Sequence, residues 1–153
     1  MPKPLLPIEH YPQEEEAGCL SACAQMVLAN LGITVSQADL NRLFELTPLG
    51  VPLSRLTRLA QHNINVAIHR NGTLDNLSQA VDQSIPPIVF VRTGQLSYWQ
   101  EDTQHALVVC GYDSPHFLVN DPALPDAPQT VLADELMLAW DEFDNAYALL
   151  TQG

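Results

Sequence analysis

Apolar and polar positions along the chain predict helices in the first half and strands in the second. The first 18 residues contain four prolines, which disfavour helix, so we expect an extended N-terminal arm over residues 1–12. A first helix is predicted over Cys19–Leu31, where apolar residues recur at the i, i+3, i+4 and i+7 positions. Alanine and methionine occupy its opposite face, which is typical of a helix buried on most sides at the centre of a fold.

Two further helices are predicted before residue 63. One spans Gln37–Phe44 and begins after Ser36, whose hydroxyl is a good N-cap. The other spans Pro52–His62, with proline in its first turn and leucines along one stripe. A shorter helix is expected after Thr73, which is also a favourable cap.

From residue 64 onward the apolar pattern changes to the period of two that is typical of strands. The continuous apolar runs at 88–91 and 106–110 indicate buried strands. A turn-like segment at 111–114 separates 106–110 from the apolar residues 117–119, so these two strands are expected to pair antiparallel. The remaining predicted elements are a strand over 64–69, a helix over 132–140 and a closing strand over 146–150.

This order of helices first and strands later predicts an α+β fold rather than alternating α/β units. The 153 residues are a usual length for one domain, so we expect a single domain over residues 1–153. With 46% apolar residues, the chain is expected to bury a core rather than to remain disordered.

The chain is strongly acidic, with 6 basic against 18 acidic side chains and a formal net charge of −12. Its only lysine is Lys3. This composition argues against binding of nucleic acids or of anionic membrane surfaces, because both rely on basic residues. It also excludes P-loops and Schiff-base chemistry, which need an ordered lysine. A charge of this sign attracts basic peptides or cations instead.

Cysteine count and hydropathy favour a reducing compartment. Three cysteines are an odd number and too few for a disulfide scaffold. The N-terminus lacks an apolar run long enough for a signal peptide, and no stretch approaches the length of about 18 apolar residues that a membrane span needs. We therefore expect a cytoplasmic protein with free thiols.

Cys19 is the first candidate for chemistry, because it follows Gly18 at the predicted start of the buried helix. The positive end of a helix dipole and its free N–H groups stabilise a thiolate, which is the nucleophilic form of cysteine. The alternative is a small buried side chain, the common environment of a free cysteine. Cys23, one turn later, is expected in the core. Because the chain has no second ligand pair with zinc spacing, we expect no metal site and no cofactor.

His105 and Asp121 are candidates for a proton-transfer pair. His105 stands between a polar loop and the strand predicted at 106–110, where a general base is both fixed and accessible. Asp121 ends the next strand, so the antiparallel turn brings it within reach of the histidine, whose cation it would stabilise. The alternatives are a histidine that merely ends a strand and an Asp-Pro turn signal.

Gln13 lies six residues before Cys19, where its amide and the backbone N–H of Cys19 are placed to donate to a developing oxyanion. Gln13-x5-Cys19, His105 before an apolar strand and Asp121-Pro after the next strand together resemble the bacteriocin-processing peptidases. These are papain-like cysteine peptidases that cut double-glycine leaders, together with their stand-alone relatives. The resemblance covers about residues 11–150.

The resemblance implies a papain-like fold, in which N-terminal helices, one of them central and buried, pack on a C-terminal antiparallel sheet. It implies that Cys19 is the nucleophile and His105 the base. Asp121 then orients the histidine, and Gln13 belongs to the oxyanion hole. The implied substrate is a peptide or protein, and we expect a free-standing domain without transporter segments.

Two positions depart from the family pattern: Leu20 follows the cysteine where glycine is usual, and Gly18 precedes it where aspartate is frequent. Leu20 is expected to alter the backbone near the oxyanion hole or to narrow the cleft. The Glu14–Glu16 run is either a solvated loop or a cleft-facing segment that favours basic substrates. Tyr98 and Trp99 either bind substrate at the sides of a peptide cleft or form a partly buried aromatic patch.

Three functions follow from these residues. The first, which we predict, is a cysteine peptidase. In that case Cys19 is alkylated rapidly, and His105→Ala suppresses this alkylation. A papain-like transpeptidase forms the same acyl-thioester but passes it to an amine or thiol acceptor. A non-catalytic module with the inherited fold binds peptides and forms no covalent intermediate.

Overall fold

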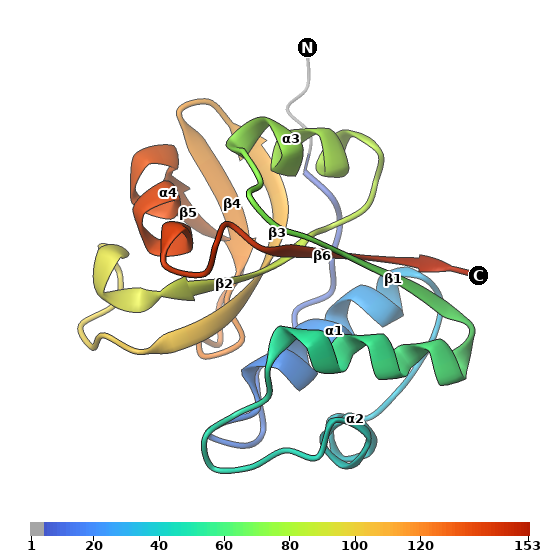
Figure 1. Ribbon diagram of the computed structural model, residues 1–153. Coiled ribbons are helices and arrows are strands. Elements are labelled where there is room, and N and C mark those ends of the chain that lie inside the picture. Colours follow the sequence, from blue (N-terminus) through green and yellow to red (C-terminus); the bar gives the residue numbers. More distant parts are fainter. Residues whose placement is uncertain (1–4) are drawn as a thin grey trace.

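The computed structural model describes residues 5–153 and places three helices ahead of all six strands of one sheet (Figure 1). Residues 1–4 of the predicted N-terminal arm lie outside the described residues, and 5–12 form no helix. No helix within 5–153 is both long and apolar enough to cross a membrane. The three helices are α1 (Cys19–Asn30), α2 (Gln37–Phe44) and the 3-10 helix η1 (Leu53–His62).

The six strands form one antiparallel sheet in the order β1-β6-β2-β3-β4-β5. The hairpin of β3 and β4 confirms the antiparallel pair that the sequence predicts on either side of residues 111–114. Two further helices and a short 3-10 turn, η2, connect the strands. The strands and connecting helices are β1 (Ile64–His69), α3 (Leu74–Asp82), β2 (Ile88–Arg92), η2 (Thr93–Gln95), β3 (Gln104–Asp113), β4 (His116–Asn120), β5 (Gln129–Leu132), α4 (Ala133–Asp141) and β6 (Tyr147–Gln152).

Helices cover both faces of the sheet. Successive side chains of a strand point to opposite faces, so Ile88 and Phe90 of β2 join the core around α1, α2 and η1. Val89 and Val91 point the other way and pack with residues of α3 and α4. Because both faces of β2 pack in hydrophobic cores, this strand is apolar at successive positions, which explains its continuous run in the sequence.

Helix α1 is the central buried helix, as predicted. It packs against β3, and its residues from Leu20 to Ala24, together with Met26, Val27 and Leu28, are buried. The N-cap Ser36 of α2 accepts a hydrogen bond from Asp39, and Thr73 forms a full capping box at the start of α3. The local cap signals in the sequence were therefore correct.

Two elements differ from the sequence predictions. The segment at 52–62 forms a 3-10 helix rather than an α-helix. Its leucines at positions 53, 56 and 59 repeat every three residues, which matches the three residues per turn of a 3-10 helix. Strand β5 was missed, because Val131 is its only fully buried residue and four residues are too short for a visible alternation. Leu132, predicted to begin a helix, ends this strand and precedes α4.

Stability is expected to depend on the core around α1. Leu28→Ala should lower the free energy of unfolding by about 2–5 kcal/mol, because Leu28 is fully buried and its truncation leaves a cavity. Leu138→Ala is the matched control, since Leu138 on α4 is 60% exposed, and its cost should stay within about 0.5 kcal/mol. Urea unfolding followed by circular dichroism measures both, and equal losses would contradict the core assignment.

Candidate active site

The N-terminus of α1 carries a partly exposed thiol. Cys19 is the first residue of the helix, and the N-cap Gly18 supplies no side-chain oxygen to its N–H groups. The first turn contains no acidic residue. The first N–H groups of a helix have no partner within the helix, so this end can stabilise negative charge on a sulfur or on an oxyanion.

His105 and Asp121 meet at the ends of neighbouring strands. His105 is the second residue of β3, and Asp121 follows the last residue of β4. The β3–β4 hairpin brings the imidazole Nε2 to 2.6 Å from Asp121 Oδ1. Both residues are buried, with 4% of His105 and none of Asp121 exposed. The contact expected from the antiparallel turn is therefore present.

Cys19 and His105 line the same cavity and interact with each other. Because Nε2 is bonded to Asp121, Nδ1 is the ring nitrogen that remains for an interaction with Cys19, which contributes to the pKa shift of the imidazole. Burial alone would lower the pKa of His105. The hydrogen bonds to Asp121 and Cys19, together with their negative charges, outweigh burial and raise this pKa to about 9. The imidazole is therefore held as a cation beside the sulfur at neutral pH.

Asp121 is a buried carboxylate, and each of its two oxygens accepts two hydrogen bonds. Oδ1 accepts from His105 and from the backbone N–H of Ala123 at 2.9 Å. Oδ2 accepts from the Tyr98 hydroxyl and from Trp99 Nε1, both at 2.8 Å. Burial opposes ionisation, but the hydrogen bonds and the charge of His105 lower the pKa of Asp121 below its usual range.

Tyr98 and Trp99 are placed differently from each other. Trp99 lines the cavity at Cys19 and stacks edge-on to His105, with ring centroids 5.0 Å apart. Tyr98 does not line that cavity, and its hydroxyl donates to Asp121 Oδ2. Trp99, but not Tyr98, therefore lies on the wall of the cavity. Direct contact of Trp99 with substrate stays a prediction.

Gln13 also lines the cavity at Cys19, but its amide is engaged locally. Its Nε2 donates to the backbone carbonyls of Glu15, at 3.0 Å, and Glu16, at 2.7 Å. Its Oε1 is buried and has no hydrogen-bond partner among residues 5–153. The backbone N–H of Gln13 donates to Pro122 at 2.7 Å, which ties this residue to the loop that follows Asp121.

Gln37 is a site residue that the sequence reasoning missed. Its side chain is buried and bonds the backbone on both sides of Gln13, with Nε2 donating to Pro12 and Oε1 accepting from Glu14, each at 2.9 Å. A second N–H donates to Gln25 of α1. Nothing local distinguishes Gln37 from a surface glutamine at a helix start, so only the tertiary structure reveals that it fixes the position of Gln13.

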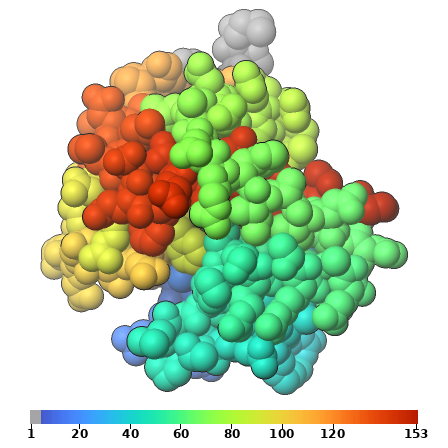
Figure 2. Space-filling view, in the orientation of Figure 1, coloured from blue at the N-terminus to red at the C-terminus, as the bar shows by residue number. Residues whose placement is uncertain are grey.

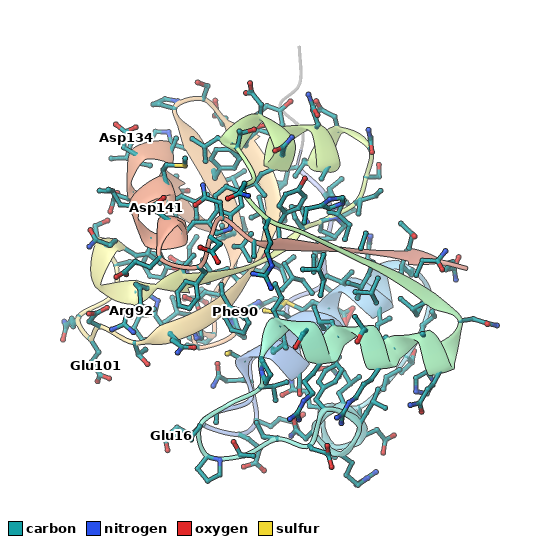
Figure 3. The ribbon with its side chains drawn as sticks, viewed as in Figure 1. Glu16, Phe90, Arg92, Glu101, Asp134 and Asp141 are labelled. Carbon is teal, nitrogen blue, oxygen red and sulfur yellow. The ribbon has the colours of Figure 1, made fainter. Side chains whose placement is uncertain are left out.

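A cavity of about 1010 Å³ gives access to Cys19 and His105. Figure 2 shows the surface hollowed between the yellow loop near residues 93–104 and the teal segment near 45–52. Glu16 and Glu101 lie on loops at either side of this opening (Figure 3), and Glu15 and Asp102 also line it. Two residues of the Glu14–Glu16 run thus face the cavity rather than forming only a solvated loop.

The neighbours of Cys19 in α1 have structural roles. Leu20 is 1% exposed, packs in the core around α1 and does not line the cavity. The expectation that it narrows the cleft is therefore wrong, because this side chain points inward. A Cβ on Gly18 would come within 3.2 Å of the Glu15 carbonyl, so the tight turn before α1 favours glycine. Cys23 is fully buried, and burial raises the pKa of its thiol well above the usual value.

A family model described as the peptidase C39 family matches residues 8–150. Among curated proteins, the comparison finds no match to the chain.

Solved structures share the fold over nearly the whole chain. A C39-like peptidase from Bacillus anthracis superposes with a TM-score of 0.79 at 16% identity, and the match covers 100% of this chain and 99% of that one. The peptidase domain of Streptococcus ComA, a bifunctional ABC transporter involved in quorum sensing, gives a TM-score of 0.76 at 18% identity, covering 94% and 97%. A double-glycine-motif protease from an AMS/PCAT transporter, solved with its leader peptide, gives 0.73 at 14% identity, covering 97% and 94%. These likenesses confirm the papain-like fold implied by the resemblance.

Proposed function

The chain belongs to the peptidase C39 family, and on this premise we propose that it is a cysteine peptidase in which Cys19, His105 and Asp121 act together. The observation that carries the proposal is the buried His105, whose Nε2 lies 2.6 Å from Asp121 and which lines one cavity with Cys19. Such an arrangement activates a thiol and supplies a proton on the same side of a scissile bond. The proposed unit is one peptidase domain over residues 1–153.

In the proposed acylation step, the Cys19 sulfur attacks the carbonyl carbon of a peptide bond and forms a C–S bond. The carbonyl oxygen takes the electron pair and becomes an oxyanion. The His105 imidazolium then gives its Nδ1 proton to the nitrogen of the leaving amine as the C–N bond breaks. This leaves an acyl-thioester on Cys19 and a neutral imidazole, while Asp121 keeps Nε2 protonated throughout.

The oxyanion is proposed to bind between the N-terminus of α1 and Gln13. The backbone N–H of Cys19 lies at the uncapped end of the helix, where the dipole favours negative charge. Gln13 can join it only if its amide releases Glu15 or Glu16 and turns one N–H towards the substrate oxygen. Gln37 holds the backbone around Gln13 in place during that rotation.

Deacylation uses the same groups in reverse. Neutral His105 takes a proton from a water molecule whose oxygen attacks the thioester carbon, and the C–S bond breaks to restore the thiolate. If an amine occupies the place of water, the same step joins two peptides. A reducing compartment such as the cytoplasm keeps Cys19 in the thiol state that the cycle requires.

The proposed substrate is a peptide or an extended protein segment. One structural relative was solved with its leader peptide bound. The cavity of this chain shares Leu49 and Phe90 with a second cavity of about 560 Å³, so the two lie next to each other. We propose that cationic residues of the substrate are favoured, because acidic groups dominate the lining at Cys19 and its one arginine, Arg92, is paired with Asp102 at 3.1 Å.

A pair of otherwise identical peptides tests this charge preference. With arginine in place of glutamate beside the scissile bond, kcat/KM should be several-fold higher, as expected for partly solvated charges, and the preference should shrink in high salt. The double variant Glu16→Gln with Glu101→Gln should lose most of this preference for the arginine peptide. The control is Asp134→Asn with Asp141→Asn on α4, which changes the net charge equally but away from the cavity (Figure 3). Equal effects of both double variants would contradict a local preference.

Covalent trapping tests the function itself. The protein is mixed with a library of basic peptides that contain a double-glycine sequence, quenched in acid within the first turnover and examined by mass spectrometry. A peptidase shows an acyl adduct on Cys19 and hydrolysed products. Transfer of the acyl group to an added amine would instead identify a transpeptidase. Peptide binding without any adduct or product, in protein whose Cys19 is reduced, would support a non-catalytic binding module.

A further inference from the structure

The second oxygen of Asp121 is bound entirely by aromatic side chains from the loop between β2 and β3. The Tyr98 hydroxyl and Trp99 Nε1 each lie 2.8 Å from Oδ2. Together with His105 and Ala123 on Oδ1, this gives the carboxylate two donors on each oxygen. The catalytic steps proposed above use only the contact at Oδ1, so the pair at Oδ2 is not explained by them.

The donors around Asp121 favour one protonation state of its carboxyl group. The indole N–H of Trp99 and the backbone N–H of Ala123 can only donate, and hydrogen bonds donated to a carboxylate are stronger than those to a neutral carboxyl group, so this set of donors favours the ionised form of Asp121. Burial and the charge of Asp121 also raise the pKa of Tyr98, which keeps its hydroxyl a donor. An ionised Asp121 in turn holds the proton of the imidazole on Nε2 and leaves Nδ1 for Cys19.

The loop that carries the two aromatic residues is itself anchored. Leu96 is 1% exposed in the core beside α4, and the backbone N–H of Ser97 donates to Glu135 of α4 at 2.8 Å. Asp102 accepts from Arg92 and from the N–H of Gly94, which closes the base of the loop. Tyr98 and Trp99 are therefore presented to Asp121 by a segment held at three points, rather than by a free surface loop.

We infer that Tyr98 and Trp99 are positioning residues that hold Asp121 ionised and aim its other oxygen at His105. They act on the reaction through Asp121, and they need not touch the substrate. This inference rests on the proposed function, because the consequence that matters is the state of the Cys19–His105 pair. It replaces the interpretation of Tyr98 as a substrate-binding residue on the wall of the cleft.

A test of this inference requires that the other ionisable groups near Cys19 and His105 keep their charges. Cys23 lies behind Cys19 in α1, where its pKa is raised and it remains a neutral thiol. The charged groups that face the pair across the cavity are Glu15, Glu16, Arg92, Glu101 and Asp102. None of these changes when Tyr98 or Trp99 is replaced by phenylalanine, so an altered pH profile reports on Asp121 and His105.

The test is the pH dependence of Cys19 alkylation by iodoacetamide in the absence of peptide. In Tyr98→Phe, and more so in Tyr98→Phe with Trp99→Phe, the carboxylate loses donors and becomes protonated at a higher pH. The ratio of the alkylation rate at pH 5 to that at pH 8 is expected to fall about tenfold in the double variant, because hydrogen bonds to a charged group are strong. For peptide cleavage, kcat should fall while KM stays nearly unchanged.

Tyr112→Phe is the matched control. The Tyr112 hydroxyl also donates to an aspartate, Asp82, at 2.6 Å, but at the surface and outside the cavity. It should leave the alkylation profile as in the wild type. A raised KM with an unchanged alkylation profile in Tyr98→Phe and the double variant would overturn the inference and favour a substrate-binding role. If wild-type Cys19 alkylates no faster than Cys110, the proposed function fails first, and this is a separate outcome.

Discussion

Replacing Cys19 by alanine is expected to lower kcat/KM for peptide cleavage by at least about 10³-fold, because the acyl-thioester can no longer form. The fold should persist, since Cys19 is only partly buried and alanine favours the first turn of a helix. Cleavage of the peptide that forms the trapped adduct, followed by chromatography, measures the loss. Urea unfolding of the variant shows whether stability is retained.

Cys110→Ala is the control for this prediction. Cys110 lies in β3 with its thiol directed at the Leu118 carbonyl and the Asn120 side chain, and burial raises its pKa to about 12. It therefore remains a neutral thiol and should not react at neutral pH. Cleavage that survives in Cys19→Ala, or that disappears only in Cys110→Ala, would rule out Cys19 as the nucleophile.

Replacing His105 by alanine is expected to lower kcat/KM by about 10²–10⁴-fold, because the leaving amine then lacks its proton donor. The same variant should alkylate Cys19 more than tenfold more slowly at pH 6. In the wild type the pKa of His105 is raised to about 9, so the imidazole is a cation at pH 6 and stabilises the thiolate beside it. Without that cation, the thiolate loses a neighbouring positive charge that favours its formation.

His62→Ala controls for the loss of a histidine. His62 is exposed at the end of η1 and does not line the cavity at Cys19. Its replacement should leave both cleavage and alkylation unchanged. Rapid alkylation of Cys19 in His105→Ala, at the wild-type rate and pH dependence, would show that the imidazole does not activate the thiol, and the proposed mechanism would fail.

Elements with strong local signals were predictable from the chain. The start of α1 at Cys19, the caps Ser36 and Thr73 and the hairpin between 106–110 and 117–119 are all present. Each depends on residues close in sequence, whose propensities and periods act before any tertiary contact. The helix at 53–62 was predicted but not its 3-10 type, and strand β5 was missed, because its four residues are too short to show an alternation.

The sequence by itself determined the α+β order of elements, the nucleophile candidate at a helix start and the histidine at a strand start, since these follow from local periodicity and spacing. Only the tertiary structure decided how Asp121 is held, that Leu20 points inward and that Gln37 fixes Gln13. Those contacts join segments that are far apart in the chain. The orientation of each side chain depends on how these segments pack, and the local sequence pattern does not determine this packing.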